Sequence, residues 1–179
     1  YLDEVSEITL FHPNVTESSM TFFSGEERNA YGQTFLPQGV ISSVAVYIPE
    51  GKSHPGNMIV NIYVESSGEL LSTVELTGDN LDKLSGEVKF NLPNDISIKE
   101  KLVFTFTTGS PTQFELIKNN DDIYPEGKLV RIGNYTSNQV NNYVSNLQLY
   151  SVSNSDDLKI TIRYSELFDD TYDRFPDDS

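Results

Sequence analysis

The chain has 179 residues, with 27 acidic against 12 basic residues, a formal net charge of −15, and no cysteine. This length suits one domain with a sizeable core, and the missing cysteines exclude a disulfide scaffold and thiolate metal sites. The excess of negative charge, without a basic stripe, argues against binding to nucleic acid or to anionic membranes. No apolar stretch is long enough to span a bilayer, so we expect no membrane insertion.

Apolar and polar residues alternate along most of the chain, which is the pattern of half-buried β-strands. In residues 44–48, for example, Val44, Val46 and Ile48 point to one side and Ala45 and Tyr47 to the other. Turn signals rich in Pro, Gly, Asn and Asp separate the strands, and no segment keeps a convincing helical period. The expected strands cover residues 8–11, 20–23, 32–36, 44–48, 58–64, 70–76, 88–92, 102–106, 113–117, 129–132, 147–149 and 158–164.

Many short strands separated by turns predict an all-β protein, an antiparallel β-sandwich or barrel. We expect this domain to occupy residues 1–165. Within it, Gly32 is expected to allow a bend or a close approach of two backbones. The chain begins with a tyrosine rather than Met, so we expect it to be processed or excised from something longer.

The last segment, residues 166–179, is expected to form a separate acidic arm. It combines many aspartates with three aromatic residues, Phe168, Tyr172 and Phe175. A purely solvating tail would not need these rings. We therefore expect the arm to dock through them, on a neighbouring molecule or, as the alternative, on the sandwich of its own chain.

Seven segments resemble, in their order, a broad family of proteins. They are YGQTF, ISSVAVYI, GNMIVNIYVESSGELLSTVEL, GEVKFNLPNDISIKEKLVFTFT, FELI, YPEGKLVRIG and DLKITIRY, within residues 31–164. In this they are similar to jelly-roll modules of the carbohydrate-binding-module type, which occur in secreted bacterial proteins and in phage virion proteins. The resemblance implies a β-sandwich of jelly-roll type. The chain departs from that family in having no Trp, the residue on which sugar-binding members often stack their ligands.

Two surfaces are candidates for ligand binding. One is the outward face of the central strands, with Tyr47, Asn61 and Tyr63, because a tyrosine offers a flat apolar ring with a polar tip. The other is the stretch 118–145, since binding residues concentrate on long loops. Its candidate residues are Tyr124, Tyr135, Asn141 and Tyr143. For both surfaces, ordinary packing or turn formation is an equally good interpretation.

The resemblance also implies a structural calcium ion, and we expect no other cofactor. Its candidate ligands are Asp156 and Asp157, which directly precede the last strand. Calcium prefers carboxylate and carbonyl oxygens on loops. The alternative, which we favour, is that these aspartates only form and solvate a turn.

Catalytic motifs are missing from the sequence. There is no Walker-type phosphate loop and no Gly-x-Ser-x-Gly elbow, and His12 and His54 each precede a proline without a nucleophile nearby. Acidic residues abound, so a glycoside hydrolase stays open as the weakest alternative.

These observations predict a non-enzymatic surface interaction module, carbohydrate-binding or adhesion-like. We expect it in an extracellular, cell-surface or virion-surface assembly, with glycans or neighbouring protein subunits as partners. A virion structural protein without a glycan ligand, such as a capsid decoration or tail component, is the alternative.

Overall fold

The computed structural model describes residues 6–9, 17–23, 30–49, 57–77, 86–107, 113–119, 127–133, 148–153 and 157–168. All regular elements in these residues are β-strands. They are β1 (Ser6–Thr9), β2 (Glu17–Phe23), β3 (Ala30–Phe35), β4 (Gly39–Tyr47), β5 (Asn57–Val64), β6 (Leu70–Thr77), β7 (Glu87–Ile96), β8 (Leu102–Thr107), β9 (Gln113–Asn119), β10 (Leu129–Gly133), β11 (Gln148–Ser153), β12 (Asp157–Leu158) and β13 (Ile160–Leu167). No helix in the described segments is long and apolar enough to cross a membrane.

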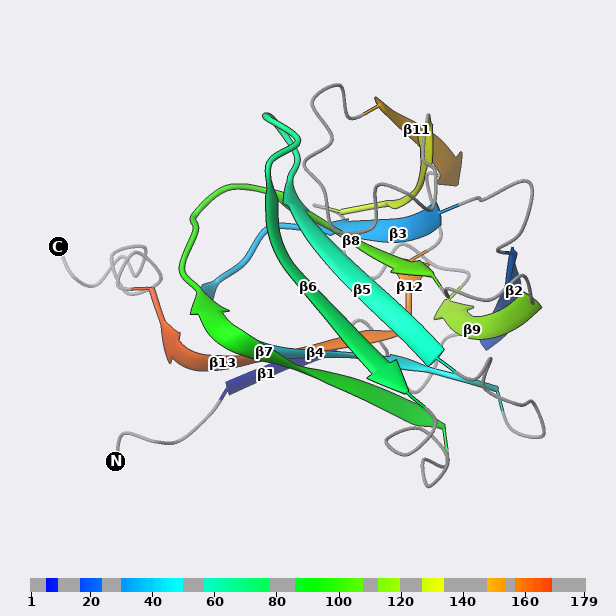
Figure 1. Ribbon diagram of the computed structural model, residues 1–179, viewed down its shortest axis with the longest axis horizontal. Coiled ribbons are helices and arrows are strands. Elements are labelled where there is room, and N and C mark those ends of the chain that lie inside the picture. The colour runs from blue at the N-terminus through cyan, green and yellow to red at the C-terminus, as the bar shows by residue number, and fades with distance from the viewer. Residues whose placement is uncertain are drawn as a thin grey trace, which may run out of the picture.

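The strands form three antiparallel sheets, named here by one strand of each. The β4 sheet has the order β1-β13-β4-β7, the β5 sheet the order β11-β10-β3-β8-β5-β6, and the β9 sheet the order β12-β9-β2. Figure 1 shows the β4 and β5 sheets as two layers, with the small β9 sheet at one end of them. The prediction of an antiparallel β-sandwich is therefore confirmed.

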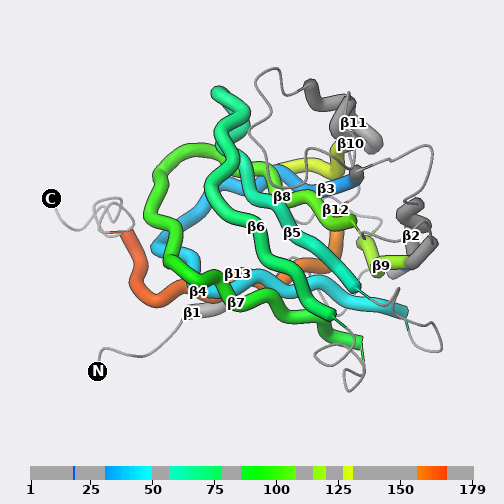
Figure 2. The backbone as a smooth tube through the Cα atoms, viewed as in Figure 1, coloured from blue at the N-terminus to red at the C-terminus, as the bar shows by residue number. Residues whose placement is uncertain are grey.

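The chain passes repeatedly between the two larger sheets. From β3 it crosses to β4, returns for the hairpin β5–β6, crosses again to β7, and returns to β8. Figure 2 shows the last of these crossings, where residues 97–101 lead from β7 to β8. Strands far apart in the sequence consequently lie side by side, such as β1 and β13.

The main core lies between these two layers. Each strand contributes alternate residues to it, among them Val44 and Phe90 from the β4 sheet and Val60 and Phe106 from the β5 sheet. The rings of Phe90 and Phe106 meet across the layers, with their centroids 6.0 Å apart. Each large apolar side chain buried in this way stabilises the fold by about 1.5–3 kcal/mol, so the alternation seen in the sequence is what holds the two sheets together.

Two strands are more deeply buried than alternation predicts. Every residue of β8 is buried, and in β5 every residue except Asn57. Both strands lie in the interior of the β5 sheet. As a result, the polar residues Asn61 and Thr105 are buried although they are not members of the core cluster.

Gly32 of β3 lies opposite Thr105 of β8. A β-carbon at this position would overlap the carbonyl oxygen of Phe104 and would come within 3.0 Å of the Thr105 α-carbon. Only glycine permits such an approach. The expected close approach of two backbones at Gly32 is thus present, and the segment around it is scaffold.

The closing strand β13 continues past residue 165, where we expected the domain to end. Glu166 and Leu167 pair with Val40 and Gly39 of β4. The backbone N–H of Phe168 then donates to the carbonyl oxygen of Gln38 at 3.0 Å. These residues belong to the sandwich rather than to a separate arm.

Candidate functional site

The outward surface of the β4 sheet carries a cluster of polar and aromatic side chains, which we call the tyrosine face. Neighbouring residues of the same strands, such as Val44, Val46, Ile160 and Ile162, belong to the core. Since side chains alternate along a strand, the residues between them point outward. Among the described side chains, the tyrosine face includes Ser43, Ala45, Tyr47, Glu87, Lys89, Asn91, Lys159, Thr161 and Arg163. The edge strand β1 adds Glu7, which lies in register with Arg163.

Tyr47 is held in place by two contacts from β13 and the residue that precedes it. Its hydroxyl is hydrogen-bonded to the hydroxyl of Thr161 at 2.7 Å. The ammonium nitrogen of Lys159 lies over the tyrosine ring, 4.6 Å from its centroid, which is within the range of a cation–π interaction. The half-buried ring is therefore pre-organised on a rigid sheet rather than on a loop.

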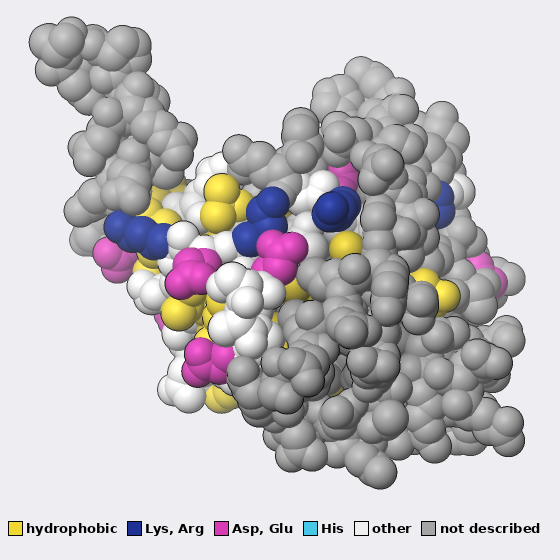
Figure 3. Space-filling model, turned by 90° about the horizontal axis from the view of Figure 1, so that it is seen from above, with side chains coloured by type: hydrophobic (Ala, Val, Ile, Leu, Met, Phe, Trp, Pro, Cys, Tyr) yellow, Lys and Arg dark blue, Asp and Glu magenta, His cyan; other side chains and the backbone are white. Residues whose placement is uncertain are grey.

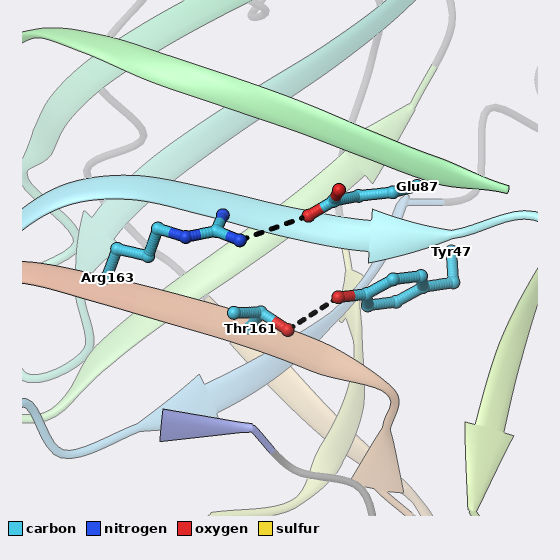
Figure 4. A network of polar contacts seen from close by, with 4 residues as sticks. All are labelled: Tyr47, Glu87, Thr161 and Arg163. Atoms are coloured by element: carbon cyan, nitrogen blue, oxygen red, sulfur yellow. Dashed lines mark hydrogen bonds and ion pairs between the residues drawn. The ribbon is translucent and has the colours of Figure 1, made fainter. Parts of the chain in front are cut away.

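An ion pair crosses the same face. A guanidinium nitrogen of Arg163 lies 3.5 Å from a carboxylate oxygen of Glu87, and the two side chains are 23% and 39% exposed. Arg163 is on β13 and Glu87 on β7, which lie on opposite sides of β4. Figure 4 shows the ion pair over β4, with Tyr47 and Thr161 beside it.

The predicted ligand residues on the central strands do not share one surface. Tyr47 faces outward from the β4 sheet, whereas Asn61 and Tyr63 belong to β5 and face away from the core on the other layer. Asn61 and Tyr63 are both 0% exposed. Of these three residues only Tyr47 is partly exposed, so only Tyr47 can contact a ligand without a change in the structure.

Asn61 lies among other polar groups of the β5 sheet. Its side-chain oxygen accepts a hydrogen bond from the Thr73 hydroxyl at 2.6 Å, and its backbone oxygen accepts one from Thr105 at 3.3 Å. Its side-chain nitrogen has no partner among the described residues. The polar groups around Asn61 are buried or half-buried and hydrogen-bonded to one another, which fits a structural role better than a ligand site.

The second predicted surface falls largely outside the structure's described residues. Tyr124, Tyr135, Asn141 and Tyr143 all lie outside them. Of the stretch 118–145, the structure describes only 118–119 and 127–133. The prediction of a loop-based ligand site stays a prediction.

Asp157 is fully buried at the junction of the β9 and β5 sheets. One of its carboxylate oxygens accepts a hydrogen bond from the side-chain amide of Gln33, on β3, at 2.9 Å. The backbone N–H of Leu158 donates to the side-chain oxygen of Gln33 at 2.9 Å. Asp157 thus does more than solvate a turn, since it fastens the β9 sheet to the main sandwich.

The described residues do not assemble a calcium site around Asp157. No three His, Cys, Asp or Glu side chains come together within the described ranges, and the Asp157 carboxylate accepts a hydrogen bond from Gln33. Asp156 lies outside the described residues. The arrangement fits a buried carboxylate that is satisfied by hydrogen bonds.

Of the three aromatic residues predicted for the arm, the structure describes Phe168. Its ring lies 5.2 Å from the ammonium nitrogen of Lys99, and its backbone is bonded to Gln38. Phe168 therefore packs on the sandwich of its own chain. Tyr172 and Phe175 lie outside the described residues.

Sequence reasoning did not select Glu87, Lys159, Thr161 or Arg163 as site residues. The only available signal was the alternation in the last strand, which places Lys159, Thr161 and Arg163 on one side and Ile160 and Ile162 on the other. Nothing local to Glu87 indicates that it pairs with a residue more than seventy positions away.

Comparisons with known proteins do not add to this description: no protein-family model matches the chain, and no curated protein is similar to it.

Proposed function

We propose that the protein is a non-enzymatic surface interaction module that recognises a glycan through the tyrosine face. The observation that carries this proposal is the fixed, half-buried ring of Tyr47 between Thr161 and Lys159. A sugar ring presents apolar C–H groups and many hydroxyls. A tyrosine ring flanked by donors and acceptors offers both kinds of contact.

Pre-organisation supports the same function. A binding group that is already held in one conformation loses less conformational freedom when the ligand arrives. The hydrogen bond to Thr161 and the contact with Lys159 provide this rigidity before any ligand is present.

The strand order supports a sandwich of jelly-roll type. The strands β1, β13, β4 and β7 form one layer, and β3, β8, β5 and β6 lie next to one another in the other. Alternation of the chain between two layers is a feature of jelly rolls, which are built from two Greek keys. Such modules occur on extracellular, cell and virion surfaces, and we propose the same location for this protein.

A structural role in a virion or other assembly is the second candidate. The observation that favours it is the fixed end of β13, where Phe168 is bonded to Gln38 and lies beside Lys99. A segment of acidic residues with Tyr172 and Phe175 follows this anchored point. It would then contact a neighbouring subunit.

A glycan array with the labelled protein, followed by calorimetry, tests the proposal. Saturable binding should fall by about thirtyfold in Tyr47→Ala, the effect of removing an aromatic residue worth about 2 kcal/mol. Tyr47→Phe, which keeps the ring, should bind within about threefold of the original. Absence of binding to any glycan, together with symmetric assembly into particles, would instead support the structural role.

A further inference from the structure

The strand β6 lies at the end of the β5 sheet. It pairs with β5 on one side, and no strand of the described residues pairs with its other side. Figure 1 shows β6 beside β5 and near β7 of the other layer. Since β6 and β7 belong to different sheets, no backbone ladder joins them. The outer edge of β6 therefore presents backbone N–H and C=O groups with which another strand can pair.

The residues of β6 do little to protect this edge. Natural proteins keep edge strands from pairing by making them very short, or with proline, charged side chains (especially Lys) and bulges. β6 is eight residues long and contains neither proline nor lysine. Its one charged residue is Glu75, and its one bulge lies at its start, at Leu71. Residues 72–77 therefore form a regular strand that is open to pairing.

The two edges of the β4 sheet, by contrast, are protected. The edge strand β7 contains Pro93, which has no backbone N–H, and carries the exposed charged residues Lys89 and Asp95. The opposite edge strand, β1, has only four residues. Among the edge strands of the two large sheets whose side chains are described, β6 is thus the unprotected one.

Apolar side chains at this edge are left partly exposed. Val74 and Leu76 lie in register with Val60 and Met58, which are fully buried. Both pack against the core, yet they are themselves only half-buried. Figure 3, seen from above, shows hydrophobic side chains at the surface between charged ones, in the described part of that face. An added strand with apolar residues at the level of Val74 and Leu76 would remove their exposed area from water.

The surroundings of β6 are acidic. The hairpin of β5 and β6, residues 57–77, has three glutamates and neither Lys nor Arg. One of them, Glu75, is exposed and accepts a hydrogen bond from the side chain of Asn57 at 2.7 Å. The neighbouring segment 97–101 and β7 together contain three acidic and three basic residues, so they leave this excess of negative charge in place. A basic partner is attracted to such a surface, whereas a second copy of the chain, with its net charge of −15, is repelled.

We propose that β6 binds an extended, basic segment of another protein, which joins the β5 sheet as a further strand. The backbone of this segment pairs with residues 72–77. Its apolar residues lie on the side of Val74 and Leu76, and the residues between them, on the side of Glu75, include Lys or Arg. In strand addition of this kind, backbone hydrogen bonds provide affinity and alternate side chains provide specificity. The tyrosine face lies on the other large sheet, so this proposal does not depend on glycan recognition.

Fluorescence anisotropy with three labelled peptides tests this assignment. The first is KVTVKVTVK, whose valines form one side of an extended strand and whose lysines and threonines form the other. The second is the acidic counterpart EVTVEVTVE. The third is the basic peptide with every internal peptide nitrogen methylated, which keeps its charges and side chains but removes its backbone donors.

The basic peptide should bind saturably. At low salt it should bind at least about tenfold more tightly than the acidic peptide, and this preference should shrink as salt rises because screening weakens it. Methylation of the nitrogens should weaken binding by at least about tenfold, since hydrogen bonds to the edge of β6 are lost.

Two variants with matched controls locate the binding site. Val74→Lys places a charge in the edge strand, which is how natural edges are blocked, and should weaken binding by at least about tenfold. Its control is Val40→Lys, at a half-buried valine of β4. Glu75→Gln should weaken binding of the basic peptide by about two- to fivefold, and its control is Glu166→Gln, at an exposed position on β13. Both controls should bind within about twofold of the original, and thermal unfolding verifies that every variant is folded.

Each contrary outcome overturns a stated part of the proposal. Equal binding of the methylated peptide, or unchanged binding in Val74→Lys, overturns strand addition at β6. Equal affinity for the acidic and basic peptides overturns the basic character of the partner, and binding of neither peptide overturns the site. Sedimentation that shows the protein dimerising without peptide, and Val74→Lys as a monomer, would assign the edge to a second copy of the chain instead.

Discussion

Replacing Gln33 by methionine should destabilise the protein more than any single change on its surface. Gln33 is 0% exposed, and its side-chain amide makes three hydrogen bonds. It donates to Asp157 at 2.9 Å and to the carbonyl of Thr34 at 3.2 Å, and it accepts from the N–H of Leu158 at 2.9 Å. Methionine has a similar length and none of these groups, so the volume is kept while the polar connection is lost.

The magnitude follows from the two partners that are most affected. The carboxylate of Asp157 loses the hydrogen bond that Gln33 donates to it. A hydrogen bond to a charged group of this kind is worth about 1.5–3 kcal/mol. The buried N–H of Leu158 is left without its acceptor, at a cost of about 1–3 kcal/mol. Together we expect about 2.5–6 kcal/mol less stability, which lowers the melting temperature by about 5–24 °C for a chain of this size.

Urea denaturation and hydrogen exchange measure the effect. The amide of Leu158 should exchange faster in Gln33→Met, because the two-residue strand β12 loses its link to β3. Gln38→Met is the matched control, since the Gln38 side chain is exposed, and it should change stability by about 0.5 kcal/mol or less. The reasoning is refuted if Gln33→Met costs under about 1 kcal/mol and the exchange of Leu158 is unchanged.

The remaining predictions concern the scaffold. Gly32→Ala should cost about 3 kcal/mol in urea denaturation, because a β-carbon there overlaps the backbone of β8. At Gly86, φ is +110° and a β-carbon would meet the Ile48 carbonyl oxygen at an ordinary contact distance of 3.7 Å. Gly86→Ala should therefore cost about 1–3 kcal/mol, from backbone strain alone. Asp157→Asn keeps a side-chain oxygen for the glutamine amide and should lose less stability than Asp157→Leu in thermal unfolding; equal losses would show that this bond is unimportant. Deleting 166–179 removes the end of β13 and should lower the melting temperature more than deleting 169–179; the same value for both would contradict the role of that strand end.

The sequence by itself determined much of the local structure. The alternation in residues 44–48 and 158–164 correctly predicted strands, and it correctly placed Val44 and Ile162 on one side and Tyr47 and Arg163 on the other. Glycine at position 32 correctly indicated a close backbone approach. These features depend on neighbours in the chain, because side chains of a strand alternate with a period of two.

Only the tertiary structure decided which of these faces meet. Tyr47 and Tyr63 both point away from the core between the two layers. They nevertheless lie on different surfaces, because β4 and β5 belong to different sheets. Gln33 and Asp157 are 124 positions apart, and nothing near either residue indicates the other. The pairing of strands is made by backbone N–H and C=O groups, which are the same in every residue except proline. The choice of partner strand therefore depends on how all the apolar faces are buried together, which no local pattern contains.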